Sequence, residues 1–128
     1  MMLVADPVAV REALARIAAS GPMAALSDDH RATAEIVLAE VLNNIAEHAY
    51  AGAAGDIAIS LCATPAGLDC QLSDHGREMP GGSPPMGTLP KEECPEGGFG
   101  WYLIRLLTQD LGYQRRHGQN LLHFVIPA

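Results

Sequence analysis

Basic residues are scarce in this chain of 128 residues. Eight Lys and Arg residues, with Lys91 as the single lysine, stand against fifteen Asp and Glu residues, and the formal net charge is −7. Proteins that bind nucleic acid or anionic membranes usually present a basic surface, so we expect neither partner. The acidity does not exclude a phosphate ligand, because helix N-termini and a bound metal ion can supply a positive field.

Cysteines are few as well, and their spacing is not that of a metal site. Cys62, Cys70 and Cys94 are an odd number without a C-x-x-C pair. Neither a disulfide framework nor a zinc site is therefore predicted. Cys62 and Cys70 lie in apolar, strand-like runs, which predicts two buried thiols.

Long apolar runs are also missing from the sequence. No stretch of about 18 apolar residues, the length that spans a membrane, occurs. The first ten residues, MMLVADPVAV, do not combine a basic region with a long apolar one, as a signal peptide does. We therefore expect a cytoplasmic protein, and its length indicates a single domain over residues 1–128.

The pattern of apolar residues predicts three helices. The first covers residues 7–19, with Asp6 as its N-cap and Pro7 at its first position. The second covers residues 27–48 and begins with acids that suit a helix N-terminus. The third covers residues 98–112.

Four strands are predicted, in two antiparallel pairs. Residues 56–64 alternate apolar and small side chains, and residues 68–74 return as their partner. Residues 113–127 form a second hairpin that turns at 117–120. The order of helices and strands predicts an α+β fold: a two-layer α/β sandwich with one mixed, mostly antiparallel sheet and helices packed on one face. A Rossmann fold fits poorly, since its strand–helix alternation is missing.

A long segment rich in glycine and proline, residues 75–99, separates the last helix from the first strand pair. Its composition excludes regular structure over most of its length. A loop this long inside a compact domain is usually a functional lid or a disordered segment.

Polar side chains interrupt the apolar pattern of the second helix. On a helical wheel, Asn44 and His48 lie inside the buried arc or at its edge, whereas Asn43 points away. Glu40 lies one turn before Asn44. These groups can simply bond to loop backbone, as most buried polar groups do. They can also form a metal-and-water site, because an amide oxygen suits Mg²⁺ and Glu40 would orient or deprotonate a nucleophile.

Two further segments have both a structural and a functional interpretation. Asp74 ends an apolar strand and is followed by Gly76. An Asp at this place commonly caps a turn, but a buried carboxylate can also accept a hydrogen bond from the amino group of a nucleobase. The glycine-rich residues 96–100 directly precede the third helix. They are either a hinge or a cradle of backbone N–H groups for phosphate.

The order of these features resembles that of the GHKL (Bergerat-fold) ATPases, which include gyrase, histidine-kinase catalytic domains and anti-sigma regulatory factors. The resemblance covers residues 7–126 and is closest to the anti-sigma regulatory factors that are serine/threonine protein kinases. EVLNNIAEH (40–48) is similar to their Glu-x-x-x-Asn-x-x-x-His pattern, and GGFGWYLIRLL (97–107) to their glycine cluster before an apolar helix.

For the phosphate end of the site, the resemblance implies that Asn44 binds a Mg²⁺ ion bridging the phosphates of ATP. Glu40 would be the general base that activates the hydroxyl of a protein substrate, and His48 occupies a cofactor-binding position nearby. The loop that closes over the phosphates would contain the glycines Gly97, Gly98 and Gly100.

For the base end, the resemblance implies that Asp74 accepts a hydrogen bond from the adenine amino group, with Gly76 beside the base. Residues 77–96 would form the ATP lid. Three departures stand out: DHGREMP (74–80) lacks a second glycine, the last strand NLLHFVI (120–126) has no Thr, and few residues precede the first helix.

The implied function is that of an ATP-binding anti-sigma factor in the partner-switching control of transcription. Such a protein would phosphorylate a Ser or Thr of an antagonist (STAS-type) protein and alternate between this partner and a sigma factor. The sequence leaves open whether the protein forms a homodimer. The alternatives are an ATP-binding docking module without kinase activity, a catalytic domain for a phosphorelay histidine, and a non-nucleotide α+β domain whose polar cluster is structural.

Overall fold

The computed structural model describes residues 1–50, 55–86 and 99–128. In chain order, its elements are β1 (Met2–Val4), α1 (Pro7–Ala18), α2 (Gly21–Ala24), α3 (Asp28–Asn44), the π-helical turn η1 (Ile45–Ala49), β2 (Asp56–Thr64), β3 (Gly67–Asp74), the 3₁₀ turn η2 (Pro80–Gly82), α4 (Phe99–Leu107), β4 (Gln109–Arg116) and β5 (Gln119–Pro127). No helix of the described ranges has both the length and the apolar character that crossing a membrane requires.

The strands form one five-stranded sheet in the order β1-β2-β3-β5-β4. Every pairing between neighbours in the described sheet is antiparallel, so the prediction of a mixed sheet is wrong. The physical reason is the position of β5. Strands β3 and β4 run in the same direction, but β5 lies between them and pairs with both.

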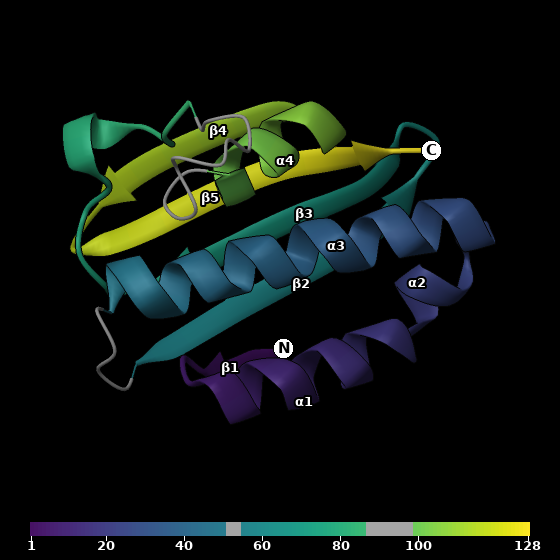
Figure 1. Ribbon diagram of the computed structural model, residues 1–128, viewed down its shortest axis with the longest axis horizontal. Coiled ribbons are helices and arrows are strands. Elements are labelled where there is room, and N and C mark those ends of the chain that lie inside the picture. The colour runs from purple at the N-terminus through teal and green to yellow at the C-terminus, as the bar shows by residue number, and fades with distance from the viewer. Residues whose placement is uncertain (51–54, 87–98) are drawn as a thin grey trace.

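The helices cover one face of this sheet, as Figure 1 shows, which confirms the predicted two-layer α+β fold. The core lies between the two layers. Apolar side chains of α3, such as Val37, Leu38, Val41 and Leu42, pack with the inward-facing residues Ile57, Leu68, Leu72, Phe124 and Ile126 of the sheet. This burial is the main favourable contribution to folding.

Local sequence signals set the starts of the long helices. Asp6 caps α1, because its Oδ1 accepts a hydrogen bond from the N–H of Ala9 at 2.9 Å. Ser27 caps α3 in the same way, through His30 N at 3.2 Å. Both observations agree with the known preference for short polar side chains at this position.

Two predicted elements need correction. The third helix ends at Leu107 instead of residue 112, because the following residues pair with β5 and form the start of β4. That pairing has an irregular register near Asp110, which has a positive φ of 56°. The last hairpin turns at His117 and Gly118, both with positive φ, and β5 already begins at Gln119.

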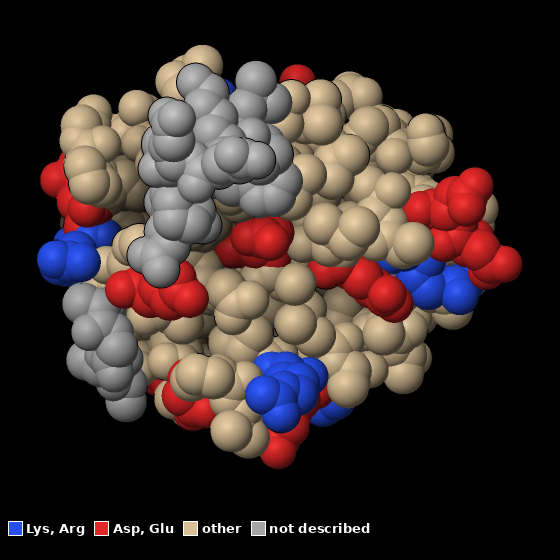
Figure 2. All heavy atoms as spheres, in the orientation of Figure 1, with Lys and Arg blue, Asp and Glu red and all other residues tan. Residues whose placement is uncertain are grey.

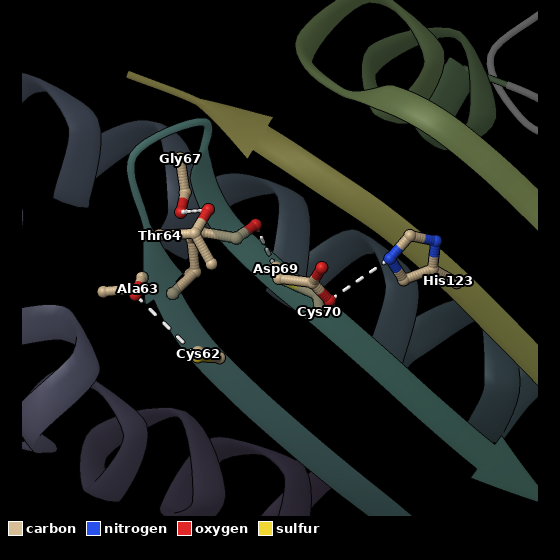
Figure 3. Close-up of polar contacts among 8 residues, drawn as sticks. Cys62, Ala63, Thr64, Gly67, Asp69, Cys70 and His123 are labelled. Atoms are coloured by element: carbon tan, nitrogen blue, oxygen red, sulfur yellow. Dashed lines mark hydrogen bonds and ion pairs between the residues drawn. The ribbon is translucent and has the colours of Figure 1, made fainter.

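One predicted buried thiol is exposed. Cys70 is buried in the core, but Cys62 is exposed, so the prediction of two buried thiols is wrong for Cys62. Side chains alternate along a strand, and Cys62 lies on the face of β2 opposite that of Ile57 and Ile59, which is not covered by helices. Figure 3 shows the same open face, where His123 Nε2 lies 3.2 Å from Asp69 Oδ1 across β3 and β5.

Acidic side chains are spread over the helical face, many of them along α3 (Figure 2). Those of α3 are Asp28, Asp29, Glu35 and Glu40. This distribution agrees with the negative net charge of the chain.

Candidate functional site

A cavity of about 540 Å³ lies between the C-terminal end of α3, the end of β3 and the beginning of α4. Its polar lining includes Asn44, His48, Asp74 and Asn120. The apolar part of the wall consists of Val41, Ile45, Met79, Trp101 and Leu122. Such a mixture of apolar surface and a few polar groups is typical of sites for small organic ligands.

Asp74 is at the last position of β3 and is only 5% exposed. Its Oδ1 accepts two hydrogen bonds of 2.8 Å each, from Gly76 N and from Asn120 Nδ2. No hydrogen bond from a described residue reaches Oδ2. The carboxylate is therefore held in one orientation and keeps an oxygen that can accept from a ligand.

Gly76 permits a close approach between the segment after β3 and the end of η1. A Cβ at this position would lie 2.5 Å from the carbonyl oxygen of Ala49. The next residue, Arg77, donates from its backbone N to the same oxygen at 2.7 Å and from its guanidinium to His48 O at 2.7 and 3.2 Å. The glycine is thus required for packing against the helix, and its place beside an adenine stays a prediction.

Glu40, Asn44 and Gly100 come together where α3 meets α4. A Cβ on Gly100 would lie 2.5 Å from Glu40 Oε2 and 3.3 Å from Asn44 Nδ2. Asn44 lines the cavity, whereas Glu40 and Gly100 lie beyond it and do not form its wall. The predicted catalytic and metal-binding side chains are therefore neighbours, at the start of the helix that follows the glycine-rich segment.

Asn44 has a buried amide nitrogen, Nδ2, without a hydrogen-bond partner within the described ranges. Leaving such a group unsatisfied costs about 1–3 kcal/mol. The oxygen and nitrogen of a side-chain amide are told apart only by their hydrogen-bond partners. The atom of Asn44 without a partner can therefore be either the donor nitrogen or the acceptor oxygen of the amide. This observation fits a ligand at Asn44 better than a purely structural role.

His48 differs from its predicted position. Its side chain is 68% exposed and lies at the rim of the cavity instead of in the buried arc. The cause is the π-helical turn η1, in which Tyr50 N bonds to Ile45 O, five residues earlier. The extra residue in this turn rotates the following side chains away from the α-helical positions. The carboxylate oxygen Oε2 of Glu47 is 3.9 Å from His48 Nε2.

Asn120 is a site residue that the sequence reasoning missed. It is 4% exposed and lies opposite Asp74 in the register of β3 and β5. The signal was present in the sequence: Asn120 shares the alternation of Leu122, Phe124 and Ile126, which are all buried. A polar residue at a core-facing position of a strand needs partners, but only the register shows that Asp74 is one.

The hydroxyl of Tyr50 connects the end of β3 to the start of β2. It donates to Asp56 O at 2.6 Å and accepts from His75 N at 2.7 Å. Burial raises the pKa of Tyr50 above its ordinary value; the His75 hydrogen bond opposes this, and the carboxylates of Asp74 and Asp56 add to it. The phenol therefore stays protonated and structural at neutral pH.

The first part of the predicted lid is tied to α4. Arg105 donates to the carbonyl oxygens of Pro84 and Pro85, at 2.7 and 2.8 Å. Residues 87–96 of the predicted lid lie outside the described residues. The same holds for Gly97 and Gly98, so their predicted role in closing over phosphates stays a prediction.

The residues around the cavity fit Mg-ATP as a ligand. A magnesium ion is usually held by one or two protein oxygens together with substrate phosphates. No group of three or more His, Cys, Asp or Glu side chains in the described parts of the chain forms a complete metal site. Asn44, with its unsatisfied amide, is the donor that such an ion would use here, and Glu40 lies beside it.

An antiparallel five-stranded sheet with helices on one face is the α+β fold of the GHKL ATPases. The family model of the histidine kinase-like ATPase domain matches residues 3–126, and the chain belongs to this family. ATP binding is expected for a domain of this family.

Solved structures have the same fold. One is the histidine kinase domain of the blue-light activated histidine kinase from Erythrobacter litoralis EL346, with a TM-score of 0.57 and 17% sequence identity. The alignment covers 94% of this chain and 59% of that one. A search of curated proteins found no match.

Proposed function

We propose that this protein is a cytoplasmic, Mg-ATP-dependent serine/threonine kinase of the anti-sigma type. It phosphorylates an antagonist (STAS-type) protein and alternates between this partner and a sigma factor. The observation that carries the proposal is the contact of Glu40, Asn44 and Gly100 at the junction of α3 and α4, next to a cavity with Asp74 on its other side.

Asp74 is the residue that would select the base. Its Oδ2 accepts no hydrogen bond from the described residues, and a carboxylate oxygen is only an acceptor. The amino group of adenine is a donor and fits this oxygen. The apolar wall around Trp101 and Leu122 suits a flat base.

At the other end of the cavity, the side chains of α3 would act on the phosphates. The amide oxygen of Asn44 would hold Mg²⁺, which neutralises phosphate charge when bound. The first turn of α4 lies at the positive end of the helix dipole, which favours an anion. Gly100 lies in this turn, and its missing side chain leaves room for the carboxylate of Glu40.

Glu40 would accept the proton of the substrate hydroxyl during in-line transfer of the phosphoryl group. The hydrogen bonds of the described residues leave its carboxylate free. The Glu40 carboxylate can orient the hydroxyl, and it takes up the proton that the attacking oxygen releases.

Nucleotide binding is tested by thermal unfolding. Mg-ATP at millimolar concentration should raise the melting temperature, since a ligand that binds only the folded state stabilises it. An unchanged melting temperature would exclude the proposed function and support a non-nucleotide domain.

The kinase step is tested with Glu40→Gln, labelled ATP and a panel of candidate antagonist domains. The variant should lose phosphoryl transfer to the cognate domain and keep its affinity for ATP, because glutamine has a similar size but accepts no proton. Glu35→Gln, an exposed acid of the same helix, is the matched control and should keep both properties. Full transfer by Glu40→Gln would remove Glu40 from its role, and binding without transfer to any domain would favour a docking module.

A further inference from the structure

The side chain of Asn120 is completely occupied by contacts within the protein. Its Nδ2 donates to Asp74 Oδ1 and to Arg77 O, both at 2.8 Å. Its Oδ1 accepts from Arg115 Nη1 at 3.0 Å and from the hydroxyl of Tyr113. An Asn side chain has two donors and two acceptor lone pairs. Asn120 therefore has no group left with which to contact a nucleobase directly.

These contacts determine which oxygen of Asp74, a residue of the cavity lining, stays available to a ligand. Gly76 N and Asn120 Nδ2 both donate to Oδ1, and two bonds to one oxygen prevent the carboxylate from rotating. Oδ2 is then the oxygen left for a ligand. If Asn120 lost its amide, Oδ1 would keep the bond from Gly76 alone, and the carboxylate could turn about it.

The same amide also holds the segment that follows β3. Tyr113, which donates to Asn120 Oδ1, accepts a hydrogen bond from Met79 N at 3.1 Å. Arg115 donates to Gly76 O at 2.5 Å. The hairpin of β4 and β5 thus holds the acceptor carboxylate through Asn120, and the beginning of the cavity wall through Asn120, Tyr113 and Arg115.

We infer that Asn120 is a positioning residue for base selectivity: it holds Asp74 so that Oδ2 accepts the exocyclic amino group of adenine. This inference rests on the nucleotide binding proposed above. Residues 120–126 of the last strand contain no hydroxyl-bearing Ser or Thr. Asn120 on this strand acts on the base indirectly, because it holds Asp74.

The test compares two nucleotides that differ only in the amino group. Titration calorimetry with ATP and with purine riboside triphosphate, which carries hydrogen at that position, gives their ratio of affinities. The unchanged protein should prefer ATP by about tenfold or more, as expected for one hydrogen bond to a charged acceptor. In Asn120→Leu this ratio should fall towards one.

A second variant, Asn120→Asp, keeps the size of the side chain and the contacts of Oδ1 with Arg115 and Tyr113. It replaces the donor that faces Asp74 with an acceptor. Two facing carboxylates raise the pKa of one of them. The preference for ATP over purine riboside triphosphate should therefore be lost near pH 8. It should recover towards pH 5.5, where the new carboxyl group at position 120 is protonated and again donates to Asp74. The unchanged protein should show no such recovery.

Phe124→Leu is the matched control, because Phe124 is buried on the same face of β5 but does not line the cavity. It should lose stability and keep the ratio of affinities. If the Leu variant does not fold, the pH series of Asn120→Asp decides. An unchanged ratio in folded Asn120 variants would overturn the inference while ATP binding stands. Absence of binding of both nucleotides by the unchanged protein would overturn the proposed function and the inference together.

Discussion

Replacing Gly100 with alanine separates the stability of this protein from its proposed activity. The new Cβ would lie 2.5 Å from Glu40 Oε2, far closer than a non-bonded contact allows, and 3.3 Å from Asn44 Nδ2. The atom in the way is the end of a flexible side chain. Glu40 can therefore rotate away, and the backbones of α3 and α4 need not move.

The expected change in the free energy of unfolding is small, because two terms oppose each other. Alanine is more favourable than glycine in a helix by about 0.5–1 kcal/mol. Forcing a side chain off its preferred rotamer costs about 0.5–1.5 kcal/mol. The net change should stay within about 1 kcal/mol. Phosphoryl transfer should fall about 100-fold, since a displacement of about 1 Å in a catalytic group has an effect of this size.

Urea unfolding and single-turnover transfer of labelled phosphate measure the two quantities. Gly21→Ala is the control, because a Cβ at Gly21, in the first turn of α2, meets no atom within 4 Å; it should transfer phosphate normally. Transfer by Gly100→Ala at the rate of this control would show that the position of Glu40 is not critical. A loss of more than about 3 kcal/mol in stability would show that Glu40 cannot move aside.

Two further predictions concern stability alone. In Gly76→Ala the new Cβ would lie 2.5 Å from the backbone oxygen of Ala49, which cannot rotate away, so the free energy of unfolding should fall by about 1–3 kcal/mol; an unchanged urea midpoint would contradict this packing. The pKa of Cys70 is raised to about 12, mainly by burial and also by the Asp69 carboxylate, from an ordinary value of 9.0. Between these two pH values the folded state holds a proton that the unfolded state releases, so this contribution to stability is intact below about pH 9 and is lost as the pH rises towards 12. Cys70→Ala should therefore show a shallower decline of stability in urea unfolding across this range, and parallel declines would refute the assignment.

Features that depend on neighbours in the sequence were predicted well. The cap of α1 by Asp6, and the strand over 56–64, follow from contacts or periodicity within a few residues. The proximity of Glu40 and Asn44 is also a local feature, because one helical turn brings them to one side of α3. Their contact with Gly100 needed the packing of α4 against α3.

The wrong predictions concern places where the backbone departs from α-helical geometry. A helical wheel predicts a buried or half-buried His48 only if the α-helical geometry continues up to that residue, but the π-helical turn η1 rotates the side chain to the surface. The predicted third helix is too long because the residues after Leu107 are compatible with a helix, and only their pairing with β5 makes them part of β4.

The sequence by itself determined the class of fold, the family to which the chain belongs, and the polar residues that α3 and the end of β3 would present. Periodicity and the order of motifs carry this information along the chain. Only the tertiary structure decided that Asn120 is a partner of Asp74. Residues 46 positions apart meet there because β5 lies between β3 and β4, and a strand register is a property of the sheet as a whole.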